Sequence, residues 1–247
     1  METEGGGWTE LLSRRDGALN DFPFQTYQRL SQTGHGSPGG NSFQPLEFWH
    51  SLTSSEEMEL LVLITCSSME FWSGYGSIRV GGSSSGFTLS IAQYDSQSTA
   101  GDSLTRSSGQ AFSTYDSDRD ASPFLNCALQ YRQPFWNENC GDANPLGNYG
   151  SSDSSDALRW DSLAGSCSSI SQIFFRVRRT RCAGGSPSPC SSCQPGFFLA
   201  TDPLTGRETC FPFCELSLCS ECHPTNPSVC VGKCASGYFL DPTTRSC

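Results

Sequence analysis

The cysteines of this chain are distributed so unevenly that they divide it into two parts. Of the 14 cysteines in 247 residues, four lie in residues 1–181 and the other ten lie in residues 182–247. A segment as short as the second buries too little apolar surface to offset the entropy lost on folding, so it needs covalent cross-links. Both numbers are even, as expected if each part closes its own disulfides. We therefore predict two domains, residues 1–181 and residues 182–247.

The same cysteine usage predicts the compartment, because disulfides persist in oxidising surroundings. We expect an extracellular protein, either secreted or the ectodomain of a longer surface protein. The first residues, Met1–Gly5, are acidic and polar, unlike a signal peptide, so we expect a fragment of a longer precursor. The longest aliphatic run, Leu60–Ile64, is too short to span a membrane. The formal charge of −10 argues against a nucleic-acid partner, which requires clustered basic residues.

The first domain is predicted to consist of short strands separated by long loops rich in Gly, Ser and Asp. The best strand candidates are apolar or alternating runs: Met58–Thr65, Phe87–Ile91 and Ile173–Val177. Residues 126–161 show neither helical nor strand periodicity, and an irregular segment of that length in a compact domain is usually functional. The expected fold class is α+β, rich in strand, with long irregular loops.

Three alternating carboxylates form the sharpest motif of the chain: Asp116, Asp118 and Asp120. They supply hard oxygen ligands along one short loop, which suits Ca²⁺. Their spacing matches the first half of an EF-hand loop, but Ala121 stands where that loop needs Gly and Cys127 where it needs Glu. The alternative is a solvated acidic turn without a metal.

Several short motifs occur in a fixed order before and after this acidic loop. In chain order they are Gly5–Thr9, Arg14–Gly17, Asp21–Phe22, Glu47–Trp49, Ala100–Leu104, Phe112–Asp116 and Asn126–Ala128, followed by Trp136, Cys140, Gly147 and Tyr149. With these motifs, residues 1–180 resemble the fibrinogen-related domain of fibrinogen chains, ficolins, tachylectins, tenascins and angiopoietins. The resemblance implies a fibrinogen C-terminal-like fold, here without the family's N-terminal subdomain.

The resemblance also implies a set of calcium ligands. Asp118 and Asp120 match the family's two side-chain ligands, and the backbone carbonyls of Ser122 and Phe124 would complete the site with water. This sequence has one residue more than the family pattern between Asp120 and Cys127. The two carbonyls therefore match the family pattern less closely than the two carboxylates do. Calcium is therefore the expected cofactor.

A ligand pocket adjoins the calcium site in this family. Cys127 and Cys140 match the disulfide beside that pocket. In lectin-type members the pocket binds acetyl groups with aromatic side chains and a histidine just after the second cysteine. That position is Gly141 in this chain, which disfavours acetyl binding. The aromatic wall would consist of Tyr131, Phe135 and Trp136, unless these residues pack in the core.

The remaining two cysteines of the first domain flank predicted strands. Cys66 ends one strand candidate, and Cys167 precedes the final one, which in the family is inserted into the central sheet. We therefore predict a Cys66–Cys167 bridge. Arg176, Arg178 and Arg179 lie in that final strand, where they are expected to point outward, although Arg176-x-Arg178-Arg179 also resembles a proprotein-convertase site.

The tail, residues 182–247, contains two similar arms, Gly196–Leu199 and Gly237–Leu240, each preceded by a cysteine three residues earlier. It resembles furin-like or growth-factor-receptor cysteine-rich repeats. We expect a small disulfide-rich domain with little regular structure, whose connectivity the sequence leaves open. The alternative is a zinc site with four cysteine ligands: Cys190, Cys193, Cys210 and Cys214.

No catalytic constellation is visible, because the three histidines are scattered in the sequence and no Gly-x-Ser-x-Gly elbow follows a strand. We expect a non-enzymatic, calcium-stabilised recognition module that binds a glycan or an extracellular protein. The alternative is a structural component of extracellular matrix or of a cell-surface filament, which would assemble into homo- or hetero-oligomers through protein contacts.

Overall fold

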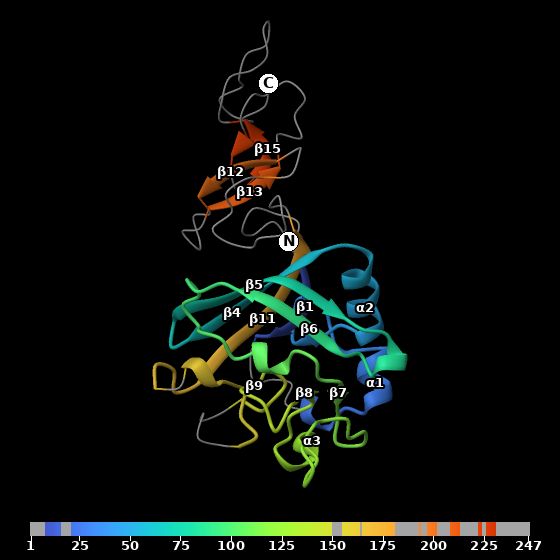
Figure 1. Cartoon of the computed structure of the whole chain (residues 1–247). Helices are drawn as coiled ribbons and strands as arrows, with labels where there is room; N and C mark the ends of the chain where they lie inside the picture. Colours follow the sequence, from blue (N-terminus) through green and yellow to red (C-terminus); the bar gives the residue numbers. More distant parts are fainter. Residues whose placement is uncertain are drawn as a thin grey trace, which may run out of the picture. The chain divides into compact units, whose positions relative to one another are not determined.

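The computed structural model describes residues 8–15, 21–149, 155–163, 165–180, 193, 197–201, 208–212, 222–223 and 226–230. The chain divides into two compact units (Figure 1). The larger one is Glu10–Val177, and the other combines Met1–Thr9 with Arg178–Cys247. In the described part of the chain, no helix has the length and apolar character required to span a membrane.

A seven-stranded sheet with the strand order β2-β3-β1-β11-β4-β5-β6 forms the framework. Its strands are β1 (Thr9–Arg14), β2 (His35–Gly36), β3 (Ser42–Phe43), β4 (Met58–Cys66), β5 (Met69–Val80), β6 (Leu89–Tyr94) and β11 (Ile170–Arg179). The strands β4, β5 and β6 follow one another as antiparallel neighbours. The last long strand, β11, lies between β1 and β4, so the chain returns to the middle of the sheet.

The apolar runs found in the sequence form the central strands. The candidate Met58–Thr65 lies in β4, and the candidate Ile173–Val177 lies in β11. The third candidate begins later than predicted, at Leu89, because Gly86 and Phe87 both adopt a left-handed backbone with φ of 68° and 55°. These two residues form a turn instead of extending the strand. The observed fold class is the expected one: rich in strand, with few helices and long loops.

The helices are short. They are η1 (Phe22–Phe24), α1 (Tyr27–Gln32), α2 (Leu46–Ser55), η2 (Ser83–Ser85), η3 (Thr105–Ser107), α3 (Cys127–Gln130) and η4 (Asp161–Leu163). The longest, α2, buries Leu46, Trp49 and Thr53. The Thr53 hydroxyl donates to the carbonyl of Trp49 and accepts from the amide of Val80 at 2.9 Å, which attaches α2 to β5.

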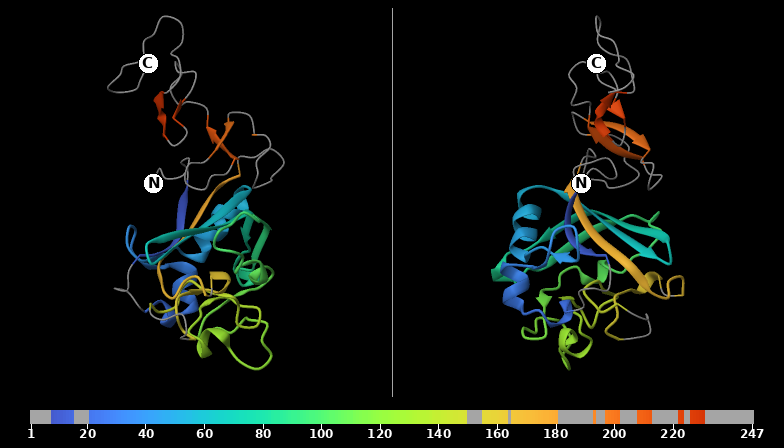
Figure 2. Two further views of the ribbon diagram at one scale, coloured as in Figure 1. Left: turned by 90° about the vertical axis from the view of Figure 1, so that its left-hand side faces the viewer. Right: turned by 180° about the vertical axis from the view of Figure 1, so that it is seen from behind.

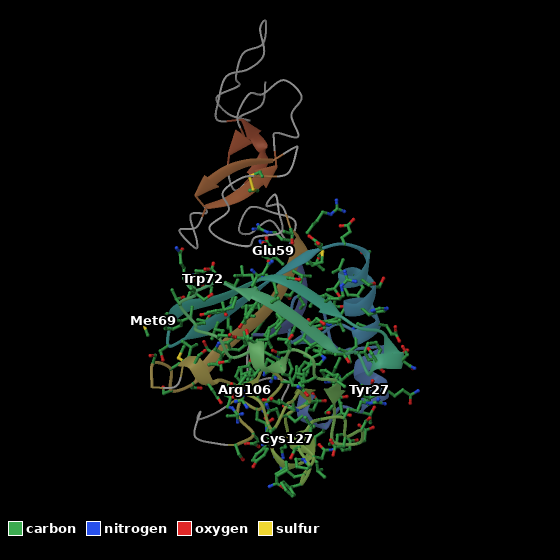
Figure 3. All side chains as sticks on the ribbon, viewed as in Figure 1. Tyr27, Glu59, Met69, Trp72, Arg106 and Cys127 are labelled. Atoms are coloured by element: carbon green, nitrogen blue, oxygen red, sulfur yellow. A yellow bond between two sulfur atoms is a disulfide. The ribbon has the colours of Figure 1, made fainter. Side chains whose placement is uncertain are left out.

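A loop region, residues 112–149 and 155–163, lies on one side of the sheet (Figures 1 and 2). Two small antiparallel ladders organise it: β7 (Phe112–Ser113) with β8 (Phe135–Trp136), and β9 (Ala143–Asn144) with β10 (Arg159–Trp160). Among the labelled side chains in Figure 3, Arg106 and Cys127 lie toward this region, whereas Glu59, Met69 and Trp72 lie on the sheet.

An aromatic core joins the loop region to the sheet. Trp136 packs edge-on against Phe112 with ring centroids 5.0 Å apart and lies 5.5 Å from Trp49 of α2. Phe135 lies edge-on against Phe175 of β11 at 6.2 Å. Each such pair contributes about 0.5–1.5 kcal/mol beyond the burial of its surface. Phe135 and Trp136 are both 1% exposed, so they follow the core-packing alternative and do not form a pocket wall.

The Cys66–Cys167 bridge has the predicted pairing. It connects the end of β4 to the segment that precedes β11 across a sequence separation of 101 residues. In the chain-entropy model, a loop of about 100 residues gives a stabilisation of about 4.7 kcal/mol. This bridge therefore restricts the long excursion between two neighbouring strands of the sheet.

The described residues of the second unit form two antiparallel strand pairs. Strand β12 (Phe197–Thr201) pairs with β13 (Glu208–Pro212), and β14 (Cys222–His223) pairs with β15 (Asn226–Cys230). A Cys193–Cys210 disulfide includes a residue of β13, in the first pair. Two members of the alternative zinc set are thus joined as a disulfide, while Cys190 and Cys214 lie outside the described residues.

Candidate functional site

The acidic loop closes around the carboxylate of Asp120. One oxygen of this carboxylate accepts the Ser122 amide at 2.9 Å, and the other accepts the Cys127 amide at 2.8 Å. The amide of Asp120 itself donates to a carboxylate oxygen of Asp118 at 3.3 Å. The Asp118 carboxylate also interacts with the Asp120 carboxyl and raises its pKa, so the two carboxylates are neighbours. They lie at the start of a loop whose end, at Cys127, is hydrogen-bonded back to Asp120.

Asp116 has a different part in the loop. One of its carboxylate oxygens accepts the Tyr27 amide at 2.9 Å and the Thr114 hydroxyl at 2.7 Å. This carboxylate connects the loop to the first residue of α1, so its described bonds are structural. Of the three alternating carboxylates, the family pattern selects Asp118 and Asp120, and these two adjoin each other in the structure.

The donor set of the loop suits a hard cation. Burial raises the pKa of the Asp120 carboxyl, the two amide hydrogen bonds oppose this effect, and the nearby Asp118 carboxylate reinforces it. A cation between the two carboxylates would offset their repulsion. No three His, Cys, Asp or Glu side chains form a metal-binding group within the described ranges. A Ca²⁺ ion, which takes six to eight oxygens, would therefore need carbonyls such as those of Ser122 and Phe124, together with water.

The Cys127–Cys140 bridge, paired as predicted, joins this loop to the segment around Gly141. Cys127 is the first residue of α3 and is fully buried, and the Asn126 side chain caps the helix by accepting the Leu129 amide at 2.8 Å. A backbone bond from the Ala121 amide to the Glu138 carbonyl, 2.9 Å, makes a second connection. The acidic loop and the Gly141 segment are thus coupled by a covalent bond and a hydrogen bond.

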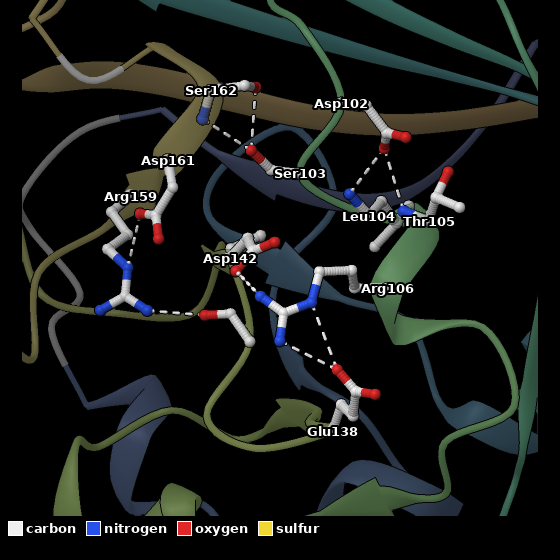
Figure 4. Close-up of polar contacts among 12 residues, drawn as sticks. Asp102, Ser103, Leu104, Thr105, Arg106, Glu138, Asp142, Arg159, Asp161 and Ser162 are labelled. Carbon is white, nitrogen blue, oxygen red and sulfur yellow. Dashed lines mark hydrogen bonds and ion pairs between the residues drawn. The ribbon is translucent and has the colours of Figure 1, made fainter.

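A cluster of charged side chains lies in this part of the molecule, and Figure 4 shows its members: Arg106, Glu138, Asp142, Arg159 and Asp161. The Arg106 guanidinium donates to Glu138 at 2.9 Å and to Asp142 at 2.7 Å, and both carboxylates raise the pKa of Arg106. The Arg159 guanidinium forms an ion pair with Asp161 at 2.8 Å and donates to the Gly141 carbonyl at 2.7 Å. The ligand surface predicted for this position is consequently polar and charged.

Burial raises the pKa of Asp161. Arg159 opposes this shift, and the charge of Asp142 adds to it. Sequence reasoning missed all five charged members of the cluster. Glu138 and Asp142 flank Cys140 in the sequence and could have been suspected. Arg106 and Arg159 come from segments far away in the chain, for which the sequence carries no signal.

The aromatic residues predicted for the pocket separate into two groups. Phe135 and Trp136 belong to the core, where the Trp136 indole donates to the Phe87 carbonyl at 2.7 Å. Tyr131 is half-buried at the end of α3. A Cβ placed on Gly141 would meet nothing closer than 3.8 Å, and its nearest neighbours would be the oxygens of Ser107, Trp136 and Asn137. The missing histidine is therefore not explained by lack of space at the Cβ position.

A strand-rich globe with a final strand inserted into its sheet and an acidic loop joined by a disulfide to the segment around Gly141 defines a fibrinogen-like globe domain. The chain belongs to the fibrinogen C-terminal family: residues 1–180 match the model described as fibrinogen beta and gamma chains, C-terminal globular domain. This family is non-enzymatic, in agreement with the expectation from the sequence.

Two curated relatives illustrate the similarity. The chain is 33% identical to tenascin from Gallus gallus over 178 residues, which are 72% of this chain and 10% of tenascin. It is 35% identical to fibrinogen C domain-containing protein 1 from Mus musculus over 191 residues, 73% of this chain and 40% of that protein. The chain thus spans only a minor part of either relative.

Two solved structures share the fold. The fibrinogen-like globe domain of human ANGPTL6 has a TM-score of 0.66 at 32% identity, covering 72% of this chain and 80% of that one. Lamprey fibrin D-dimer, complexed with the peptide Gly-His-Arg-Pro-amide, has a TM-score of 0.61 at 20% identity, covering 70% and 61%. The family match ends at residue 180, so the furin-like character of the tail stays a prediction.

Proposed function

We propose that residues 1–181 form an extracellular recognition module in which calcium stabilises a loop beside the ligand-binding surface. The observation that carries this proposal is the adjacent pair of carboxylates, Asp118 and Asp120, in a loop that Asp120 closes onto Cys127. The side chains of these two residues and the carbonyls of Ser122 and Phe124 would hold the ion. The ligand is a glycan or an extracellular protein.

A bound calcium ion would supply positive charge beside the carboxylates of Asp118 and Asp120. Side chains of the chain itself hold the loop closed around this position. Asp120 keeps the loop closed through the amides of Ser122 and Cys127. The disulfide to Cys140 and the cap at Asn126 keep α3 in place. Calcium would then order irregular backbone that has no long ladder of its own, and would present the residues around α3 to a ligand.

Thermal unfolding of the full chain with calcium and with a chelator tests the calcium site. Binding to the folded state adds about 2.7 kcal/mol of stability when free calcium is 100 times its dissociation constant. We expect calcium to raise the melting temperature of the unmodified chain and of the control Glu70→Gln, which alters an exposed carboxylate on β5. Asp118→Asn should lose the increase. Identical curves for the unmodified chain in calcium and in chelator would refute the calcium part of the proposal.

A second candidate function is a structural component of extracellular matrix or of a cell-surface filament. It is favoured by two large apolar side chains that are exposed, Leu129 in α3 and Phe124 three residues before that helix. Sedimentation velocity of the full chain in calcium separates the two candidates. Concentration-dependent self-association would favour the structural role, and a monomer at all concentrations would favour recognition.

For the tail, we propose a separate disulfide-stapled domain of furin-like repeats, residues 182–247, which acts as a spacer or assembly surface. The Cys193–Cys210 bridge and the two strand pairs support this proposal. Peptide mapping under non-reducing conditions is the direct test. A bond from a tail cysteine to Cys66, Cys127, Cys140 or Cys167 would refute the separation into two domains.

A further inference from the structure

A small space lined by oxygen atoms lies beside Gly141, which has no side chain to fill it. The atoms nearest to a Cβ built on Gly141 are Ser107 Oγ, the Trp136 carbonyl oxygen and Asn137 Oδ1, at 3.8, 3.8 and 3.9 Å. Gly141 is buried, and so are Ser107, Trp136 and Asn137. We name this space the Gly141 site. A group of about the size of a methyl fits there among three polar atoms.

Asn137 is the member of the site whose hydrogen bonding is incomplete. Its side-chain nitrogen donates to the Gln133 carbonyl at 2.9 Å and to the Phe135 carbonyl at 3.4 Å. These two acceptors fix the orientation of the amide, because exchanging its nitrogen and oxygen would place an acceptor against two carbonyls. Asn137 Oδ1 is buried and accepts no hydrogen bond within the described part of the chain. Buried acceptors are nearly always paired with a protein group or with ordered water, so the site calls for a donor.

The three oxygens match the hydrogen bonds of one water molecule. A buried water typically makes about three hydrogen bonds. The Trp136 carbonyl and Asn137 Oδ1 accept the two hydrogens of the water, and the Ser107 hydroxyl can donate to its oxygen. Hydrogen bonds between oxygens are about 2.5–3.0 Å long, so a water about 1 Å beyond the Cβ position, toward these oxygens, lies within reach of them.

Other small occupants fit the site less well. Calcium and magnesium take six or more oxygen ligands, whereas the site offers three, and the acidic side chains nearby are paired with Arg106 and Arg159. An anion would face two acceptors that cannot donate to it. An apolar group would leave Asn137 Oδ1 unpaired. A neutral group that both donates and accepts is what the three oxygens require.

From these observations we propose that the Gly141 site binds one structural water molecule through Ser107, Trp136 and Asn137. The water takes the place of a side chain at position 141. This proposal is separate from the recognition function and from calcium binding, because none of the three residues belongs to the acidic loop.

The water joins two segments that also meet in the charged cluster. Arg106 precedes Ser107 and Glu138 follows Asn137 in the chain, and the side chains of Arg106 and Glu138 form an ion pair at 2.9 Å (Figure 4). That ion pair is exposed to solvent and is screened by salt. The hydrogen bonds of a buried water are shielded from solvent, so they hold η3 to the end of β8 at any salt concentration.

A high-resolution crystal structure of the full chain tests the site directly. We expect one density peak at hydrogen-bonding distance from Ser107 Oγ, the Trp136 carbonyl oxygen and Asn137 Oδ1. An empty position would overturn the proposal. A peak with the shorter distances and the larger number of ligands typical of a metal ion would overturn it as well.

Two substitutions at the same position measure the hydrogen bonds of the water. Gly141 does not have a left-handed backbone, so alanine and serine are both compatible with its conformation and restrict the unfolded chain similarly. Both displace the water, but Gly141→Ser places its own hydroxyl among the three oxygens, whereas Gly141→Ala leaves Asn137 Oδ1 unpaired. Chemical denaturation should therefore give a folding equilibrium constant about 5-fold smaller for Gly141→Ala than for Gly141→Ser.

The same pair of substitutions at Gly40 is the matched control. Gly40 is half-buried and has no left-handed backbone, and an added Cβ would meet only Ser37, at 3.5 Å. Gly40→Ala and Gly40→Ser should be equally stable. Equal stability of the two Gly141 variants, or a water retained in the crystal structure of Gly141→Ala, would refute the proposal. If neither Gly141 variant folds, the crystal structure of the unmodified chain still decides.

Discussion

The sheet and the loop region are stabilised by different forces. The central strands β4 and β11 combine ladder hydrogen bonds with extensive burial: seven of the ten side chains in β11 and seven of the nine in β4 are buried. The loop region instead relies on side chains that bond backbone amides, such as Asp120 and Asn126, on one disulfide and on ion pairs. A substitution outside the apolar core leaves the burial that stabilises the sheet in place. In the loop region, by contrast, a single substitution can remove one of the polar contacts on which that region relies.

The largest expected effect is at the junction between the two regions. Trp136→Ala removes a fully packed indole that contacts Phe112 and Trp49 and donates to the Phe87 carbonyl. We expect a loss of about 3–5 kcal/mol in the free energy of unfolding, measured by chemical denaturation. The control Phe48→Ala, at an exposed position of α2, should change stability by only about 0.5 kcal/mol. A small effect of Trp136→Ala would mean that the loop region is not supported by the aromatic core.

The same contrast explains what could be predicted from the sequence. The strands β4 and β11 were predictable because their burial demands runs of apolar, β-branched and aromatic residues within a few positions. The beginning of β6 was not, because the carbonyls of the left-handed turn at Gly86 and Phe87 accept hydrogen bonds from Phe112 and Trp136, far away in the chain. Phe135 and Trp136 lie in a segment without periodicity, so burial and exposure could not be distinguished there.

The arginines of β11 show a second limit. They were expected to point outward, and Arg179 is exposed, but Arg176 and Arg178 are only 8% and 6% exposed. Arg176 stacks over the Phe174 ring at 4.9 Å and forms an ion pair with Glu10 at 3.6 Å. Arg178 stacks over the Trp8 ring at 4.3 Å. Burial of an arginine depends on partners from other strands, which a single segment of sequence does not reveal. A protease would also meet these residues inside a strand, which disfavours cleavage there.

The candidate site was partly predictable for a related reason. Asp118 and Asp120 belong to one short motif, so the pattern of the family identified them. The cluster around Gly141 draws Arg106, Glu138, Asp142, Arg159 and Asp161 from three separate segments. Only the fold brings these residues together, and no motif connects them.

An intermediate effect is expected at Asp102, which supports the η3 turn from the loop that follows β6. Its carboxylate accepts the Tyr75 hydroxyl at 2.9 Å and the amides of Leu104 and Thr105 at 3.0 Å. Burial alone would raise the pKa of Asp102, but the hydrogen bonds from Thr105, Leu104 and Tyr75 outweigh it and lower the pKa. The charged form is therefore favoured by folding, and its stabilisation is present above the ordinary pKa of an aspartate.

Asp102→Asn keeps the shape of the side chain and removes only the charge. We expect it to lower stability by about 1 kcal/mol at neutral pH, because a charged acceptor forms stronger hydrogen bonds than a neutral one. The difference from the unmodified chain should shrink as the pH falls below about 4, through the lowered pKa. Denaturation curves at several pH values measure this. A difference that stays constant down to low pH would show that the charge of Asp102 is not what supports the turn.

The smallest expected effect on stability is at the charged cluster itself. Arg106 is 56% exposed, and its partners Glu138 and Asp142 are 45% and 30% exposed. Solvent-exposed ion pairs contribute about 0–1 kcal/mol and are screened by salt. Arg106→Gln should therefore lower the free energy of unfolding by less than about 1 kcal/mol at low salt, and by nothing measurable at high salt. If the unfolding energy instead fell by several kcal/mol, the cluster would be a stabilising element like the aromatic core. A stable Arg106→Gln chain with altered ligand binding would indicate that these charges are retained for recognition, because their contribution to folding is too small to explain three ion pairs around one glycine.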